Sequence, residues 1–167
     1  MDLLKVKNSY LNHIKIFIDS KNNDKHLLRC FIDNWFAYHK KGPFLSKNNK
    51  PVWFNKPNPV KSKDALLSMH FISKKAFEVI KNQNLDVRLI KEHSIPVSII
   101  YDLLLEQDFN NENDIEIFLL KYYRLGVLTK DEDNVLAKEG LKKKMPENWN
   151  MQMNVFYRYE KVGIISK

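Results

Sequence analysis

The residues best suited to proton transfer in this sequence are its five histidines. Among them, His93 stands five positions after Arg88. An imidazole exchanges protons near neutral pH, and a guanidinium stabilises negative charge that builds up on a phosphate. His93 and Arg88 are therefore candidates for proton transfer and for stabilising charge on a phosphate.

Two short resemblances cover the same residues. Glu92-His-Ser-Ile-Pro96 resembles the Asp/Glu-His-x-x-Pro opening of HNH-type nucleases, in which the histidine activates water, although no histidine follows His93 in this chain. The segment from Arg88 to His93 resembles the Arg-x4-His spacing of HEPN ribonucleases, all-helical proteins that cleave RNA without a metal. Both resemblances imply a nuclease with His93 as a catalytic residue, and the second adds Arg88. The alternative is a structural histidine placed before a helix.

Other catalytic patterns are missing from the sequence. The four glycines form no phosphate-binding loop, and neither HExxH nor Gly-x-Ser-x-Gly occurs. The single cysteine, Cys30, excludes a cysteine-rich zinc site, and its apolar neighbours predict a buried thiol in a reducing compartment. We therefore expect no metal and no cofactor.

The charge of the chain favours an anionic partner. Its formal net charge is +8, and residues 40 to 63 contain seven lysines and no acid. Because lysine offers a mobile point charge and not the planar fork of arginine, we expect contacts to a phosphate backbone with low sequence preference. An AT-rich genome would also enrich lysine and asparagine without selection for binding.

Aromatic residues lie within the same lysine-rich segment. Trp53 and Phe54 offer faces on which bases stack. A second lysine cluster follows near residue 142. The predicted phosphate-binding residues are Lys47, Lys50, Lys56, Lys61, Lys63, Lys142, Lys143 and Lys144. They form an interface only if they gather on one face, and solvated loops are the alternative.

The leading hypothesis is a small nucleic-acid-associated protein that binds DNA or RNA through the phosphate backbone. The nuclease is the second hypothesis. A third is a protein-interaction module, such as an inhibitor, immunity or host-takeover factor of phage or defence-associated origin, which presents Trp53 and Phe54 to a protein partner. The sequence has no signal peptide and no apolar run near the ~20 residues of a membrane span, so we expect a cytoplasmic protein that does not bind membranes.

The elements that position these residues follow from the apolar spacing. Apolar residues recur every three or four positions from Leu3 to Ile18 and again from Leu27 to Phe36, which predicts a helical hairpin over residues 1–40. Gly42 and four of the six prolines exclude regular helix from residues 41–63. That segment is predicted to be a basic loop rich in proline and aromatic residues.

Residues 64–167 are predicted to be a mainly helical remainder. Ser73 is a candidate N-cap, Asp114 caps a helix that Gly126 ends, and Thr129-Lys-Asp-Glu132 forms a capping box. The expected strand covers residues 86–90. Acids at the start of the helix after Thr129 would repel phosphates, which disfavours a helix-turn-helix over residues 114–139.

These elements predict a mostly α fold. We expect a single compact domain over residues 1–167, with about six to seven helices, a Pro-rich irregular segment and at most a small β element.

Overall fold

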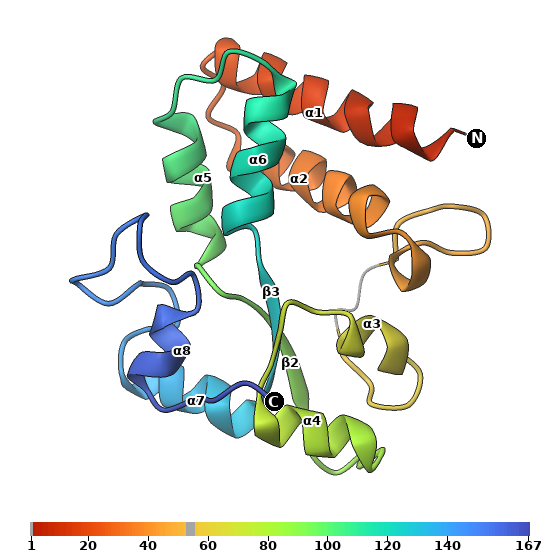
Figure 1. Cartoon of the computed structure of the whole chain (residues 1–167), viewed down its shortest axis with the longest axis vertical. Helices are drawn as coiled ribbons and strands as arrows, with labels where there is room; N and C mark the ends of the chain where they lie inside the picture. Colours follow the sequence, from red (N-terminus) through yellow and green to blue (C-terminus); the bar gives the residue numbers. More distant parts are fainter. Residues whose placement is uncertain (1, 53–55) are drawn as a thin grey trace. The chain divides into compact units, whose positions relative to one another are not determined.

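Residues 2–52 and 56–167 are described by a computed structural model of the chain (Figure 1). Their contacts divide the chain into two compact units that interleave along the sequence. Unit 1 comprises Met1–Trp53 and Tyr101–Leu120, and unit 2 comprises Phe54–Ile100 and Lys121–Lys167. The contacts divide the chain at three places: inside the basic loop, after Ile100 and after Leu120. The single domain over residues 1–167, with its segments 1–40, 41–63 and 64–167, stays a prediction.

Unit 1 is helical. The long helices α1 (Leu3–Asp19) and α2 (Lys25–Lys40) pack against each other and are the two helices that the apolar spacing predicts. A 3₁₀ turn at Gly42–Phe44 follows, and the unit also contains most of α5 (Val97–Leu105) and α6 (Glu112–Tyr122). Its buried core includes Ile14, Phe17, Leu28, Ile32, Trp35, Phe36, Leu104, Ile115 and Leu119.

Two local predictions for unit 1 are wrong. Cys30 is exposed and not buried, because it lies on the outer side of α2 while Leu28 and Ile32 face the core. The side chain that accepts from the first amides of α6 is that of Asn111, not Asp114, so the helix begins earlier than expected.

Unit 2 is built on a three-stranded sheet in the order β1-β3-β2. The central strand β3 (Leu125–Thr129) pairs in parallel with β1 (Phe71–Ile72) and antiparallel with β2 (Leu89–His93). Four helices belong wholly to this unit: α3 (Lys63–Leu67), α4 (Lys74–Lys81), α7 (Lys130–Lys138) and α8 (Tyr157–Lys161). The buried cluster Phe71, Leu128, Leu136, Tyr159 and Ile164 joins the sheet to α7 and α8.

The sequence predicts that Gly126 ends a helix, but this glycine lies within β3. A Cβ atom at this position would come 3.3 Å from the Phe71 Cβ and 3.5 Å from the Tyr159 hydroxyl. Glycine therefore permits the close approach of β1 and α8 to the central strand. The presence of β3 between α6 and α7 also means that residues 114–139 do not form a helix-turn-helix.

The parallel strands β1 and β3 each lead directly into a capped helix. Ser73 Oγ accepts from the Ala76 amide at the start of α4, and Thr129 with Glu132 forms the predicted capping box of α7. The buried Glu132 carboxylate also accepts from Ser73 Oγ at 2.6 Å. One carboxylate thus stabilises the N-terminal ends of two neighbouring helices.

The described residues form eight α-helices and this small sheet, which agrees with a mostly α fold. Among these helices, none has both the length and the apolar character that crossing a bilayer requires.

Candidate nucleic-acid interface

The charge of the chain is divided unequally between the two units. Unit 1 contains ten basic and ten acidic side chains, so its formal charge is zero. Unit 2 contains 18 basic and ten acidic side chains, so its formal charge is +8. The whole excess of the chain therefore lies in unit 2.

The inequality persists among the exposed side chains. Unit 1 exposes seven cations and seven acids, whereas unit 2 exposes thirteen cations and seven acids. The exposed cations of unit 2 are Lys56, Lys61, Lys74, Lys75, Lys81, Arg88, Lys121, Lys138, Lys142, Lys143, Lys144, Lys161 and Lys167, and its exposed acids are Asp64, Glu78, Asp86, Asp131, Glu139, Glu147 and Glu160. The other three acids of unit 2 are withdrawn from the surface.

Those three acids are Glu92, Glu132 and Asp133. Asp133 is buried in α7 and accepts from Lys130 at 2.5 Å and from Lys142 at 3.1 Å. Burial alone would raise the pKa of Asp133, but the two lysine hydrogen bonds outweigh it and lower this pKa. The carboxylate thus stays charged and fixes one end of the 142–144 cluster.

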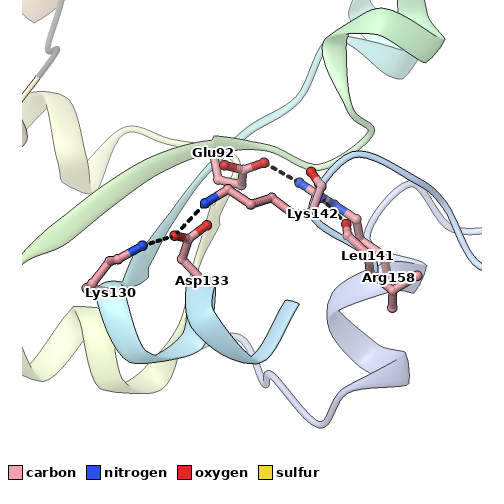
Figure 2. A network of polar contacts seen from close by, with 6 residues as sticks. All are labelled: Glu92, Lys130, Asp133, Leu141, Lys142 and Arg158. Atoms are coloured by element: carbon pink, nitrogen blue, oxygen red, sulfur yellow. Dashed lines mark hydrogen bonds and ion pairs between the residues drawn. The ribbon is translucent and has the colours of Figure 1, made fainter. Parts of the chain in front are cut away.

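Arg158 fixes the backbone at the start of the 142–144 cluster. Its side chain is fully buried, and Nη1 donates to the carbonyls of Leu141 at 2.7 Å and Lys142 at 3.1 Å. Figure 2 shows the guanidinium beside these residues, with Lys142 extended toward Asp133. The backbone that leads into Lys143 is therefore positioned by two buried polar groups.

The remaining donors of Arg158 are also used. Nη2 donates to Glu92 Oε1 at 2.5 Å and to the His93 carbonyl, and Nε donates to the Ser94 carbonyl at 2.8 Å. A guanidinium has five N–H groups, and all five have acceptors here. Arg158 therefore has no donor left for a phosphate, and we assign it a positioning role.

Glu92 is the counter-charge of Arg158. Burial raises the pKa of Glu92, and the attraction of Arg158 reduces this increase without cancelling it. The pair connects β2 to α8, which lie far apart in the sequence.

The lysines of the basic loop are divided between the units. Lys47 and Lys50 belong to unit 1, where a bridge between Leu45 and Pro51 closes the turn that carries them. Both side chains are exposed. Trp53 and Phe54, the predicted stacking residues, lie outside the described residues.

The second part of the loop belongs to unit 2. Asn58 Oδ1 accepts from the amides of Val60 and Lys61, both at 2.9 Å, which fixes the turn before α3. Lys56 and Lys61 are exposed, and Lys63 is partly buried at the start of α3. Unit 2 therefore contains six of the eight predicted phosphate-binding lysines.

The predicted catalytic residues are not brought together within the chain. The Arg88 carbonyl accepts from the Lys130 amide, so Arg88 extends the ladder of β2, and His93 ends that strand. At about 3.3 Å per residue their α-carbons lie about 16 Å apart, and an odd separation points their side chains to opposite faces. The His93 ring packs edge-on against Tyr123, with centroids 5.0 Å apart.

A metal would need a cluster of ligands. In residues 2–52 and 56–167, no group of three or more His, Cys, Asp or Glu side chains is arranged to hold an ion.

Comparison with known proteins finds no match: no protein-family model, curated protein or solved structure is similar to this chain.

Sequence reasoning missed the buried polar cluster beneath residues 141–144. Only four of the 28 basic residues are arginine, and an arginine in so lysine-rich a chain is a signal for bidentate or buried pairing. That signal applies equally to Arg29, Arg88, Arg124 and Arg158. It does not indicate the partners of Arg158, because these lie on other elements.

Proposed function

We propose that this chain is a nucleic-acid-associated protein, resident in the cytoplasm, which binds the phosphate backbone of DNA or RNA with low sequence preference. The single observation that supports the proposal is that the entire charge excess of +8 belongs to unit 2, while unit 1 is neutral. A uniformly lysine-rich composition would have charged both units alike.

The chemistry of the exposed cations supports contact with phosphates. Lys143 and Lys144 are exposed and follow a backbone segment that Arg158 holds in place. Lysines neutralise phosphates and release the counterions condensed on them, a term that does not depend on sequence. The six predicted lysines in unit 2 are residues 56, 61, 63 and 142–144.

Binding should therefore weaken steeply with salt. We would measure the affinity of the full chain for a fluorescent 15-nucleotide single strand and for the matching duplex between 50 and 200 mM KCl. Six phosphate contacts predict a loss of about 10³-fold for the duplex and about 300-fold for the single strand over this range. An affinity that changes less than about tenfold would contradict a phosphate interface.

Charge variants locate the interface. The triple variant Lys138→Gln, Lys143→Gln, Lys144→Gln removes exposed cations from unit 2 and spares Lys142. It should lower the affinity and reduce the salt slope by about one for each lysine that contacts a phosphate. The matched control, Lys5→Gln, Lys21→Gln, Lys41→Gln, removes three exposed cations from unit 1 and should leave binding unchanged.

A further variant tests the predicted residues in unit 1. If the double variant Lys47→Gln, Lys50→Gln binds as tightly as the wild-type chain, the interface is restricted to unit 2. If it binds more weakly, the interface also includes these two lysines. Equal losses in the unit 1 and unit 2 triple variants would contradict the proposal, because they would indicate a response to total charge.

A further inference from the structure

A pocket in unit 2 lies beside β1, where the C-terminal residues cover the edge of the sheet. Ser166 forms an antiparallel bridge with Ser73, and the Lys167 amide donates to the Ile72 carbonyl at 3.0 Å. The pocket has a volume of about 400 Å³, within the ~300–1,000 Å³ of typical ligand sites. Its lining residues are His70, Phe71, Phe156, Glu160, Gly163, Ile164, Ile165 and Ser166.

Aromatic rings form much of the apolar wall. The Phe71 and Phe156 centroids lie 5.2 Å apart with a tilt of 35°, and Phe71 also packs against Tyr159. Because Phe71 and Tyr159 belong to the buried cluster of unit 2, packing fixes the wall in place. Phe156 is only partly buried, so its ring offers a face on which a planar ligand can stack.

The polar groups of the pocket are few. Leu125 N–H donates to His70 Nδ1 at 3.2 Å, which fixes the orientation of that ring from β3. Glu160 is exposed, and its Oε1 accepts from the side-chain amide of Asn154. A carboxylate repels a phosphate at this position, so it favours a ligand group that presents N–H donors.

The backbone of one lysine adjoins the pocket, because the Lys74 amide donates to the Ile165 carbonyl at 2.9 Å. The side chains of two other nearby lysines lie elsewhere: Lys161 lines a different pocket, and Lys167 Nζ lies over the Phe77 ring at 5.0 Å. The pocket therefore suits the planar ring of a ligand with N–H donors, and the described residues that line it supply no cation for an attached phosphate.

We propose that this pocket binds the guanine base of a nucleotide or of a single strand, with the base stacked on Phe156 and its N1–H and N2–H groups donating to Glu160. Guanine is the nucleobase that presents two adjacent N–H donors on its Watson–Crick edge, and a carboxylate accepts such a pair bidentately. The inference deepens the proposed function and rests on it for the biological partner.

The first experiment titrates the ¹⁵N-labelled full chain with GMP, IMP, AMP and inorganic phosphate, and follows the amide resonances. GMP should shift the amides of His70 and residues 163–166. IMP lacks only the 2-amino group of GMP and should bind about tenfold more weakly, because one hydrogen bond to a charged acceptor is lost. AMP should also bind more weakly than GMP.

Variants test the two contacts separately. Glu160→Gln keeps one carbonyl oxygen for Asn154 and should remove the preference for GMP over IMP. Glu147→Gln makes the same charge change at an exposed carboxylate that does not line this pocket, and should keep the preference. Phe156→Leu should weaken the binding of all three nucleotides.

Three results would overturn the inference: equal affinity of the wild-type chain for GMP and IMP, the same shifts with inorganic phosphate as with GMP, or no shift of residues 163–166 at millimolar GMP. The two proposals can fail separately. If GMP binds at this pocket but the unit 2 lysine variant binds oligonucleotides as tightly as the wild-type chain, only the proposed function is contradicted. If oligonucleotides bind in a salt-dependent way but GMP causes no shift, only the guanine site is contradicted.

Discussion

Unit 1 and unit 2 expose equal numbers of acids but different numbers of cations. Each unit exposes seven acids, whereas unit 1 exposes seven cations and unit 2 exposes thirteen. Both units also hold ion pairs away from solvent, as in Lys7–Glu116 of unit 1 and Arg158–Glu92 of unit 2. The extra exposed cations therefore leave the surface of unit 1 balanced and that of unit 2 strongly basic.

This contrast shows that the net charge of the chain is not spread evenly over its surface. In unit 2, Glu92 pairs with Arg158, and Asp133 pairs with Lys130 and Lys142. These contacts also fix the backbone of residues 141–142. The following changes test the ion pairs and helix caps of the two units, in order of decreasing effect.

The largest effect is expected at the buried pair of unit 2. Arg158→Met leaves Glu92 unpaired and four carbonyls in two chain segments without their donor, and should lower the free energy of unfolding by about 3–5 kcal/mol. Urea unfolding followed by circular dichroism measures this loss. The double variant Arg158→Met, Glu92→Leu should recover part of it, because no uncompensated carboxylate remains. A single-variant loss below about 1 kcal/mol would show that the cluster does not hold the unit together.

The second effect compares N-caps in the two units. Ser73→Ala removes a buried cap that also donates to Glu132, and should cost about 2 kcal/mol. Asp24→Ala removes an exposed cap of α2 and should cost about 0.5–1 kcal/mol. Thermal unfolding of both variants measures the difference. Equal losses would contradict a special role for Glu132 at the two helix ends.

The third effect is a pH dependence in unit 1. Burial lowers the pKa of His39, Lys7 and Lys40 act in the same direction, and Glu116 opposes them. The unfolded chain therefore binds a proton more readily than the folded chain, so stability should fall as the pH drops below the ordinary histidine pKa of about 6.5.

The variant His39→Gln measures the contribution of this histidine. Its free energy of unfolding should decrease less between pH 7.5 and pH 5.5 than that of the wild-type chain, as followed by urea unfolding at each pH. A steeper decrease in the variant would reverse the sign that we assign.

The smallest effect is expected at an exposed pair. Lys25 and Asp102 have side chains about half exposed, at 49% and 53%. Lys25→Gln should cost about 0.2–1 kcal/mol, and this cost should shrink in 0.5 M NaCl because salt screens exposed charges. Urea unfolding at both salt concentrations tests this. A loss as large as that of Arg158→Met would erase the contrast between the units.

Several elements were predictable because their signals are local. Ser73 and Thr129 cap helices as predicted, because a cap depends on residues within one helical turn. Gly140 and Gly163 end their segments with positive φ. The strand β3 was missed because Leu125–Thr129 is buried throughout, and a continuous apolar run lacks the alternation that marks a strand.

The candidate site was less predictable than the fold. The exposed lysines of residues 142–144 were found from their sequence cluster. The polar groups that hold this cluster depend on tertiary contacts, because Arg158 and Glu92 are 66 positions apart and Asp133 meets Lys142 from another element. For Arg88 and His93, the sequence spacing did not indicate their positions in the fold: Arg88 directly precedes β2 and His93 is its last residue. Their catalytic role stays a prediction.

That this chain is basic, mostly helical and rich in lysine follows from composition and short-range periodicity, which need no tertiary contacts. The location of the charge follows from folding, since the units interleave along the chain and each acid is either exposed or buried according to its packing. Burial and pairing are properties of residues that meet in space, and the order of residues alone does not specify which ones meet.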